Sequence, residues 1–141
     1  MLVNCVAYQN GHKVADLRTG ELHRKMKEPG TLVWVALKDP EPAEFDPFVT
    51  EFKLHELAVE DALRGHQRPK IEEYGDSLFM VLHTIQLDAD GELEIGEVDV
   101  FVGPGYILSV RNRTLEGFAK VRERCEQEPE LLKNGSVFVL Y

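Results

Sequence analysis

Two adjacent carboxylates, Glu60 and Asp61, are the side chains of this 141-residue sequence best suited to bind a ligand. Carboxylate oxygens suit Mg²⁺, but this ion keeps most of its waters, and two carboxylates alone do not enclose it. Acids from another segment or another subunit would have to complete such a site. The competing interpretation is structural: Glu60 and Arg64, four residues apart, could form a surface ion pair, and Asp61 could pair with Arg64 or Arg68.

The other chemically versatile residues do not form a recognisable site. The histidines show no HxH, HxxH or HxxxH spacing, and no cysteine lies near them, so a tetrahedral zinc site is not expected. Strand alternation places His83 on one face with Phe79 and Val81, which predicts a histidine in the core. The sequence contains no GxSxG, P-loop or GxGxxG motif. We therefore expect no enzyme and no catalytic residues.

A short helix is predicted to position the two carboxylates. Leu54, Ala58 and Ala62 recur every four residues, with Leu57 beside them, and form an apolar stripe on the face opposite Glu60. The following Gly65 is typical of the end of a helix. These residues predict a helix that turns its carboxylates away from the core.

A polar link, His66-Gln67-Arg68-Pro69-Lys70, follows this helix. Pro69 cannot continue a helix and favours an extended Arg68, so we expect a strand to begin at Lys70. The link could bind an anion. The favoured interpretation is a rigid connection in which Arg68 and Lys70 pair with nearby acids such as Glu60, Asp61 or Glu72.

The rest of the chain predicts a sheet with helices on its faces. The almost wholly apolar run 31–37 is typical of a strand buried on both faces, and tight turns between residues 78 and 110 predict an antiparallel meander. The expected fold class is α/β, an α/β/α layered domain with a mixed, partly antiparallel central sheet. Strands are expected over 2–8, 12–17, 31–37, 78–87, 93–102 and 106–110, and helices over 20–27, 42–52, 54–64 and 115–127, the last with Thr114 as N-cap and Leu115 turned inward.

Composition limits the possible partners. The 16 basic and 25 acidic residues give a net charge of −9, which argues against non-specific nucleic-acid binding and suits cations or a solvated surface. Cys5 and Cys125 are expected to be free thiols. No run approaches the ~20 apolar residues that span a bilayer. Because Ser136 would start a helix whose apolar residues stop at Tyr141, we expect the chain to be a fragment of a longer parent.

One segment also carries a family resemblance. Val59-Glu60-Asp61 followed by His66-Gln67-Arg68-Pro69-Lys70, between a strand holding Trp34 and the strand 77–82, resembles the cytosolic N-terminal domain of the CorA magnesium/cobalt transport family, which includes the ZntB zinc transporters. The resemblance covers most of the chain and implies the same layered fold. It also implies that residues 1–141 form a single cytosolic regulatory domain, truncated before the long helix and the transmembrane segments with the family's Gly-Met-Asn loop.

The resemblance further implies a role for the carboxylates. Glu60 and Asp61 would bind Mg²⁺, or Co²⁺ or Zn²⁺, at the interface between neighbouring subunits of a homo-pentamer, with the remaining acids supplied from beyond Tyr141. Bound cation would favour the closed pore. Gln67, Arg68, Pro69 and Lys70 would be a structural signature. The parent would lie at the cytoplasmic face of the inner (plasma) membrane, held there only by the missing helices.

Three other functions stay open at this point. A stand-alone soluble domain could bind a protein partner through its acidic face, independently of divalent ions. A ZntB-like zinc transporter domain would share the cytosolic fold. A small acid/base enzyme would need a deep pocket beside Glu60 or Asp61, with a strongly raised pKa on one of them. A cation sensor instead requires both carboxylates to be at least partly exposed on one edge.

Overall fold

The computed structural model describes residues 1–114 and 117–140. Seven strands, five α-helices and two 3-10 helices make up this part of the chain. In chain order they are β1 (Leu2–Gln9), β2 (His12–Asp16), η1 (Thr19–Glu21), α1 (Leu22–Met26), β3 (Thr31–Lys38), α2 (Pro42–Phe52), α3 (Glu56–Arg64), β4 (Lys70–Tyr74), β5 (Ser77–Leu87), β6 (Leu93–Gly103), β7 (Tyr106–Asn112), α4 (Ala119–Gln127), α5 (Pro129–Lys133) and η2 (Ser136–Leu140).

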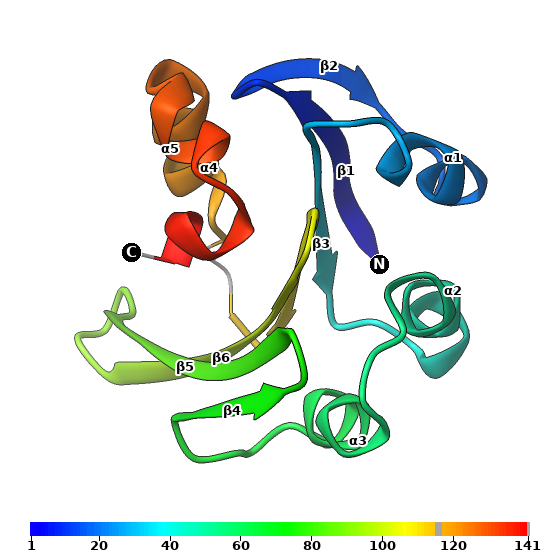
Figure 1. Ribbon diagram of the computed structural model, residues 1–141. Helices are drawn as coiled ribbons and strands as arrows, with labels where there is room; N and C mark the ends of the chain where they lie inside the picture. The colour runs from blue at the N-terminus through cyan, green and yellow to red at the C-terminus, as the bar shows by residue number, and fades with distance from the viewer. Residues whose placement is uncertain (115–116, 141) are drawn as a thin grey trace.

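All seven strands form one sheet in the order β2-β1-β3-β7-β6-β5-β4. Strands β3 and β7 run parallel, and the other neighbouring pairs run antiparallel. Helices α1, α2 and α3 cover one face, and α4 and α5 cover the other (Figure 1). The predicted layered α/β fold with a mixed sheet is therefore confirmed, including the antiparallel meander from β5 to β7.

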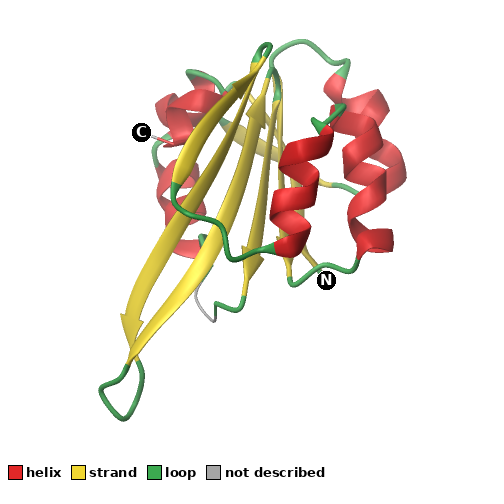
Figure 2. Ribbon diagram, turned by 90° about the horizontal axis from the view of Figure 1, so that it is seen from below, coloured by secondary structure: helices red, strands yellow, loops and turns green. Residues whose placement is uncertain are grey.

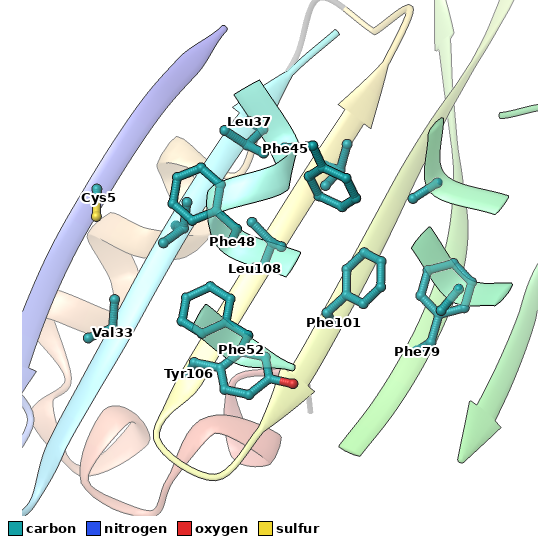
Figure 3. Packing of buried hydrophobic residues seen from close by; sticks show 14 of the residues in the cluster. Cys5, Val33, Leu37, Phe45, Phe48, Phe52, Phe79, Phe101, Tyr106 and Leu108 are labelled. Atoms are coloured by element: carbon teal, nitrogen blue, oxygen red, sulfur yellow. The ribbon is translucent and has the colours of Figure 1, made fainter. Parts of the chain in front are cut away.

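Aromatic side chains hold α2 on the sheet. Phe45, Phe48 and Phe52 recur at helical spacing and are buried. The ring of Phe52 stacks on Tyr106 with centroids 4.3 Å apart, and the ring of Phe45 lies 5.9 Å from Phe101 (Figure 3). This packing fixes the helical layer in which α3 lies. A second core on the opposite face surrounds Trp34, Val100 and Cys125.

The long hairpin of β5 and β6 extends past the helices (Figure 2). Its apolar side chains near the tip are consequently exposed: Ile85 by 69% and its cross-strand partner Ile95 by 64%. His83 is exposed as well, so the prediction of a core histidine was wrong. The alternation along β5 was correct, but no helix covers that face of the strand at residue 83.

Two helix starts differ from the prediction. Helix α3 begins at Glu56, capped by His55, whose Nδ1 accepts the N–H of Leu57 at 3.2 Å. This start leaves Leu57 exposed, not on the buried stripe. Helix α4 begins at Ala119 with Phe118 as N-cap, so Thr114 does not cap it, and Leu115 lies outside the described residues. Within residues 1–114 and 117–140, no helix has the length and apolar composition needed to span a membrane.

Candidate functional site

Helix α3 places both candidate carboxylates at the surface. Its buried residues are Ala58 and Ala62, which face the core beneath the helix. The side chain of Glu60 is 51% exposed and that of Asp61 is 24% exposed. This arrangement meets the expectation for a cation sensor that both carboxylates be accessible.

Each carboxylate already has a basic partner. Glu60 accepts from Arg64 at 2.5 Å, which is the surface ion pair that the spacing allowed. Asp61 pairs with Lys70 at 2.7 Å, so the suggested pairing with Arg64 or Arg68 was wrong. The reason is geometric: β4 returns directly beside α3 and brings Lys70 to Asp61. Arg68 is exposed and forms no ion pair with a carboxylate of the described residues.

Lys70 connects two acids on different elements. Its Nζ donates to Asp61 on α3 and to Glu72 Oε1 on β4, the latter at 3.0 Å, as the structural interpretation of the link expected for Lys70. Tyr74 donates its hydroxyl to the other oxygen of Glu72 at 2.8 Å. The hydrogen bond to Asp61 is the main cause that raises the pKa of Lys70, and the bond from Lys70 lowers the pKa of Glu72. Lys70 and Glu72 are therefore both charged near neutral pH.

The link between α3 and β4 is tied to the sheet through its backbone. Gln67 donates its N–H to Glu97 Oε2 at 2.9 Å, and its carbonyl lies 2.8 Å from Nε2 of His83. His66 has a positive φ of 59°, which the turn after α3 requires. These contacts support a structural role for Gln67, while Arg68 and Pro69 are exposed. No contact among the described residues singles the link out as an anion site.

Two buried acids lie beneath this link and were not anticipated. Glu97 is 4% exposed and Asp99 is 0% exposed, both on the face of β6 that α3 covers. Asn112 Nδ2 donates to Asp99 Oδ2 at 3.3 Å and to the carbonyl of Ala62 at 3.0 Å. One oxygen of each acid, Glu97 Oε1 and Asp99 Oδ1, has no hydrogen-bond partner within the described part of the chain. Alternation with valines along β6 is equally typical of a solvated strand face, so it gave no sign of burial.

The environment of Asp99 favours its neutral form. Burial is the main cause that raises the pKa of Asp99 to about 8, and the charges of Glu97 and Asp61 raise it further. Glu97 is also close enough to accept a hydrogen bond from the protonated acid. Near neutral pH Asp99 therefore keeps its proton, which removes a buried charge from beneath α3.

The described residues do not bring together a complete set of ligands for one metal ion. Among residues 1–114 and 117–140, no three His, Cys, Asp or Glu side chains come together as ligands of one ion. Glu60 and Asp61 supply hard oxygen donors, which fit Mg²⁺, but they can provide at most two ligands. Any site built on them needs donors from elsewhere.

Three cavities open elsewhere on the domain. A cavity of about 550 Å³ opens between the sheet and α4, where Trp34, Arg111 and Phe118 line it. Two smaller ones lie beside Tyr74 and beside Tyr8. Neither Glu60 nor Asp61 lines any of the three. The deep pocket that an acid/base enzyme would need beside them is not among these cavities.

The layered fold is shared with solved structures of low sequence identity. Over 89% of this chain it superposes on the full-length CmaX protein, with a TM-score of 0.73, 19% identity and 39% of that chain covered. The ZntB cytoplasmic domain from Vibrio parahaemolyticus RIMD 2210633 gives a TM-score of 0.66 at 12% identity, covering 89% of this chain and 50% of that one. At such identities the likeness defines the class of fold: the α/β cytoplasmic domain found in ZntB.

Sequence comparison then gives the family. The model of the family described as CorA-like Mg²⁺ transporter protein matches residues 29–140, and the chain belongs to this family. YfjQ of Bacillus subtilis (strain 168), named as a metal ion transporter, is 31% identical over 140 residues, 99% of this chain and 42% of that protein. The cobalt/magnesium transport protein CorA of Thermotoga maritima (strain ATCC 43589 / DSM 3109 / JCM 10099 / NBRC 100826 / MSB8) is 28% identical over 118 residues, 82% of this chain and 34% of that protein. The chain thus spans less than half the length of either relative, and the resemblance drawn from residues 59–70 is confirmed.

Proposed function

We propose that this chain is the cytosolic, N-terminal cation-sensing domain of a CorA-like Mg²⁺/Co²⁺ transporter, a single regulatory domain over residues 1–141 that precedes the long helix and the transmembrane segments. The observation that carries the proposal is the pair Glu60 and Asp61 on α3, the first exposed and the second partly exposed, within a chain of this family. The parent would lie at the cytoplasmic face of the inner membrane.

The proposed mechanism is ligand-gated closure. Glu60 and Asp61 would supply half of a cation site, and a neighbouring subunit of a homo-pentamer would supply the rest. A bound Mg²⁺ bridges the acids and favours the closed arrangement. When Mg²⁺ leaves, the carboxylates repel one another, and the net charge of −9 on each domain adds to this repulsion. The ion shifts the equilibrium only by its difference in affinity for the two arrangements.

The chemistry of the donors favours Mg²⁺ over Zn²⁺. Both candidate ligands are carboxylates, which suit hard cations, whereas zinc sites in proteins are typically built from cysteine and histidine. No cysteine lies on α3 or on the link to β4, and both cysteines of the chain are buried elsewhere. A ZntB-like zinc domain with the same fold would predict a stronger response to Zn²⁺ than to Mg²⁺ in the experiment below.

The test uses the full-length parent. Replacing Glu60→Gln and Asp61→Asn together should weaken the inhibition of uptake by internal Mg²⁺, while circular dichroism of the domain stays unchanged. The control Asp90→Asn with Glu94→Gln removes the same charge from the exposed hairpin. Inhibition that is unchanged in the first variant, or weakened equally in the control, would rule out this site.

A further inference from the structure

Lys70 lies where a cation bound to Asp61 would have to be. Its ammonium stands 2.7 Å from Asp61 Oδ2, in a pair whose two side chains are only 28% and 24% exposed. A positive charge at this place neutralises the carboxylate and repels a second cation, whichever oxygen that cation approaches. We infer that Lys70 is a built-in competitor of the divalent cation at Asp61 and sets the concentration at which the proposed site fills. This inference rests on the proposed function.

The competitor is held in place by the fold. Lys70 is the first residue of β4, follows the rigid Pro69 and pairs in register with Val81 of β5. Its ammonium also lies 5.7 Å from the centre of the Phe79 ring. Because these contacts are intramolecular, the effective concentration of the ammonium at Asp61 is high and independent of the solution. A divalent cation must therefore bind strongly enough to overcome it.

The other carboxylate has a much weaker competitor. Glu60 pairs with Arg64, but these side chains are 51% and 68% exposed, so water and salt screen the pair. The partly buried Asp61–Lys70 pair is screened less. Of the two carboxylates, Asp61 is thus the one whose cation affinity depends on a partner within the chain.

Glu72 makes the exchange possible without leaving Lys70 unpaired. It already accepts from Lys70 at 3.0 Å and is itself oriented by the Tyr74 hydroxyl. When a cation binds Asp61, Lys70 remains paired with Glu72. The exchange therefore avoids the large cost of an unpaired, partly buried charge. Lys70 and Glu72 should consequently act on cation affinity in opposite directions.

The experiment measures the concentration of internal Mg²⁺ that inhibits uptake by the full-length parent, because this chain supplies only part of the proposed site. Lys70→Gln should tighten apparent Mg²⁺ binding about tenfold, equivalent to about 1.4 kcal/mol. The matched control is Lys25→Gln, which removes the same charge from a lysine of similar exposure on α1. Lys25 pairs with Glu28 at 2.9 Å, and its replacement should change Mg²⁺ binding little. Circular dichroism of the domain establishes that each variant is folded.

A second pair of variants tests the role of Glu72. Glu72→Gln should weaken Mg²⁺ binding, because Lys70 loses its alternative acceptor, and it should do so more than Glu73→Gln, which removes an exposed charge from the opposite face of β4. If Lys70→Gln does not fold, the comparison of Glu72→Gln with Glu73→Gln tests the inference by itself. If the wild type, Lys70→Gln and Glu72→Gln all bind Mg²⁺ with the same apparent affinity, the inference about Lys70 is overturned, but the proposed site is not. Uptake that internal Mg²⁺ does not inhibit in the wild type or in any variant would overturn the site itself.

Discussion

The buried acid Asp99 should make the domain less stable as the pH rises. Its carboxyl group is fully buried between β6 and α3, and burial raises its pKa to about 8 from an ordinary value of 3.8. The folded chain therefore binds this proton more tightly than the unfolded chain. Its contribution to stability is fully present below the unfolded pKa and is lost as the pH rises toward the folded pKa.

The size of the effect follows from the difference between the folded and the unfolded pKa of Asp99. Each pH unit is worth about 1.4 kcal/mol of differential protonation, which gives a ceiling of about 6 kcal/mol between the two pKa values. Local relaxation and water entry reduce such penalties. We therefore expect Asp99→Asn to be more stable than the wild type by about 2–3 kcal/mol near pH 8, with a smaller difference in mild acid. The asparagine cannot ionise, and its amide can donate to the free oxygen of Glu97.

The measurement is urea unfolding of both proteins at several pH values from mild acid to about pH 8. Other groups titrate over this range, so the informative quantity is the difference between the two free energies of unfolding at each pH. Glu94→Gln, an exposed acid on the same strand, is the control and should give a constant difference. Parallel pH profiles for Asp99→Asn and the wild type would refute the assignment of a raised pKa to Asp99.

Two further predictions concern packing. Phe101→Ala should lower the free energy of unfolding by about 3–5 kcal/mol in urea titrations, because the Phe101 ring fills the space between Phe79 (4.7 Å between centroids) and Phe45. Gly11→Ala should cost more than about 1 kcal/mol in the same assay, because φ at Gly11 is +83° and a Cβ would lie 2.1 Å from the carbonyl oxygen of Pro129. A change within experimental error in either variant would contradict the packing described above.

Local patterns predicted most of the fold for a physical reason. The side chains of the mainly apolar run 31–37 are all removed from water only when both faces of the strand are covered. Accordingly, β3 lies in the interior of the sheet between β1 and β7. The helix expected over residues 42–52 is α2, whose phenylalanines recur at helical spacing and form its buried face. Such patterns predict which face of a helix or strand is apolar, but they do not predict how far along that face the neighbouring elements cover it. His83 was misplaced because the alternation along β5 continues after the helical cover ends.

The site was harder to predict because its contacts join distant segments. Sequence spacing identified Glu60 and Asp61, and it allowed Lys70 as a partner of Asp61, but it equally allowed Arg64 and Arg68. Which base reaches Asp61 depends on the direction in which β4 leaves the turn after Gly65, and that direction follows from the backbone bonds of Gln67 to Glu97 and His83. The burial of Asp99 depends in the same way on where α3 comes to lie.

The attachment of α3 explains how a weak ligand could move it. The helix has nine residues and buries only Ala58 and Ala62, so hydrophobic burial contributes little to holding it. Polar contacts supply the rest: Asn112 to the carbonyl of Ala62, and Lys70 to Asp61. Elements held in this way open more easily than a strand buried in the sheet. We therefore expect α3 amides to exchange with deuterium faster than those of β7. Equal protection of the two elements would show that α3 is part of the rigid core, and a gating role for its carboxylates would then require the whole domain to move as one body.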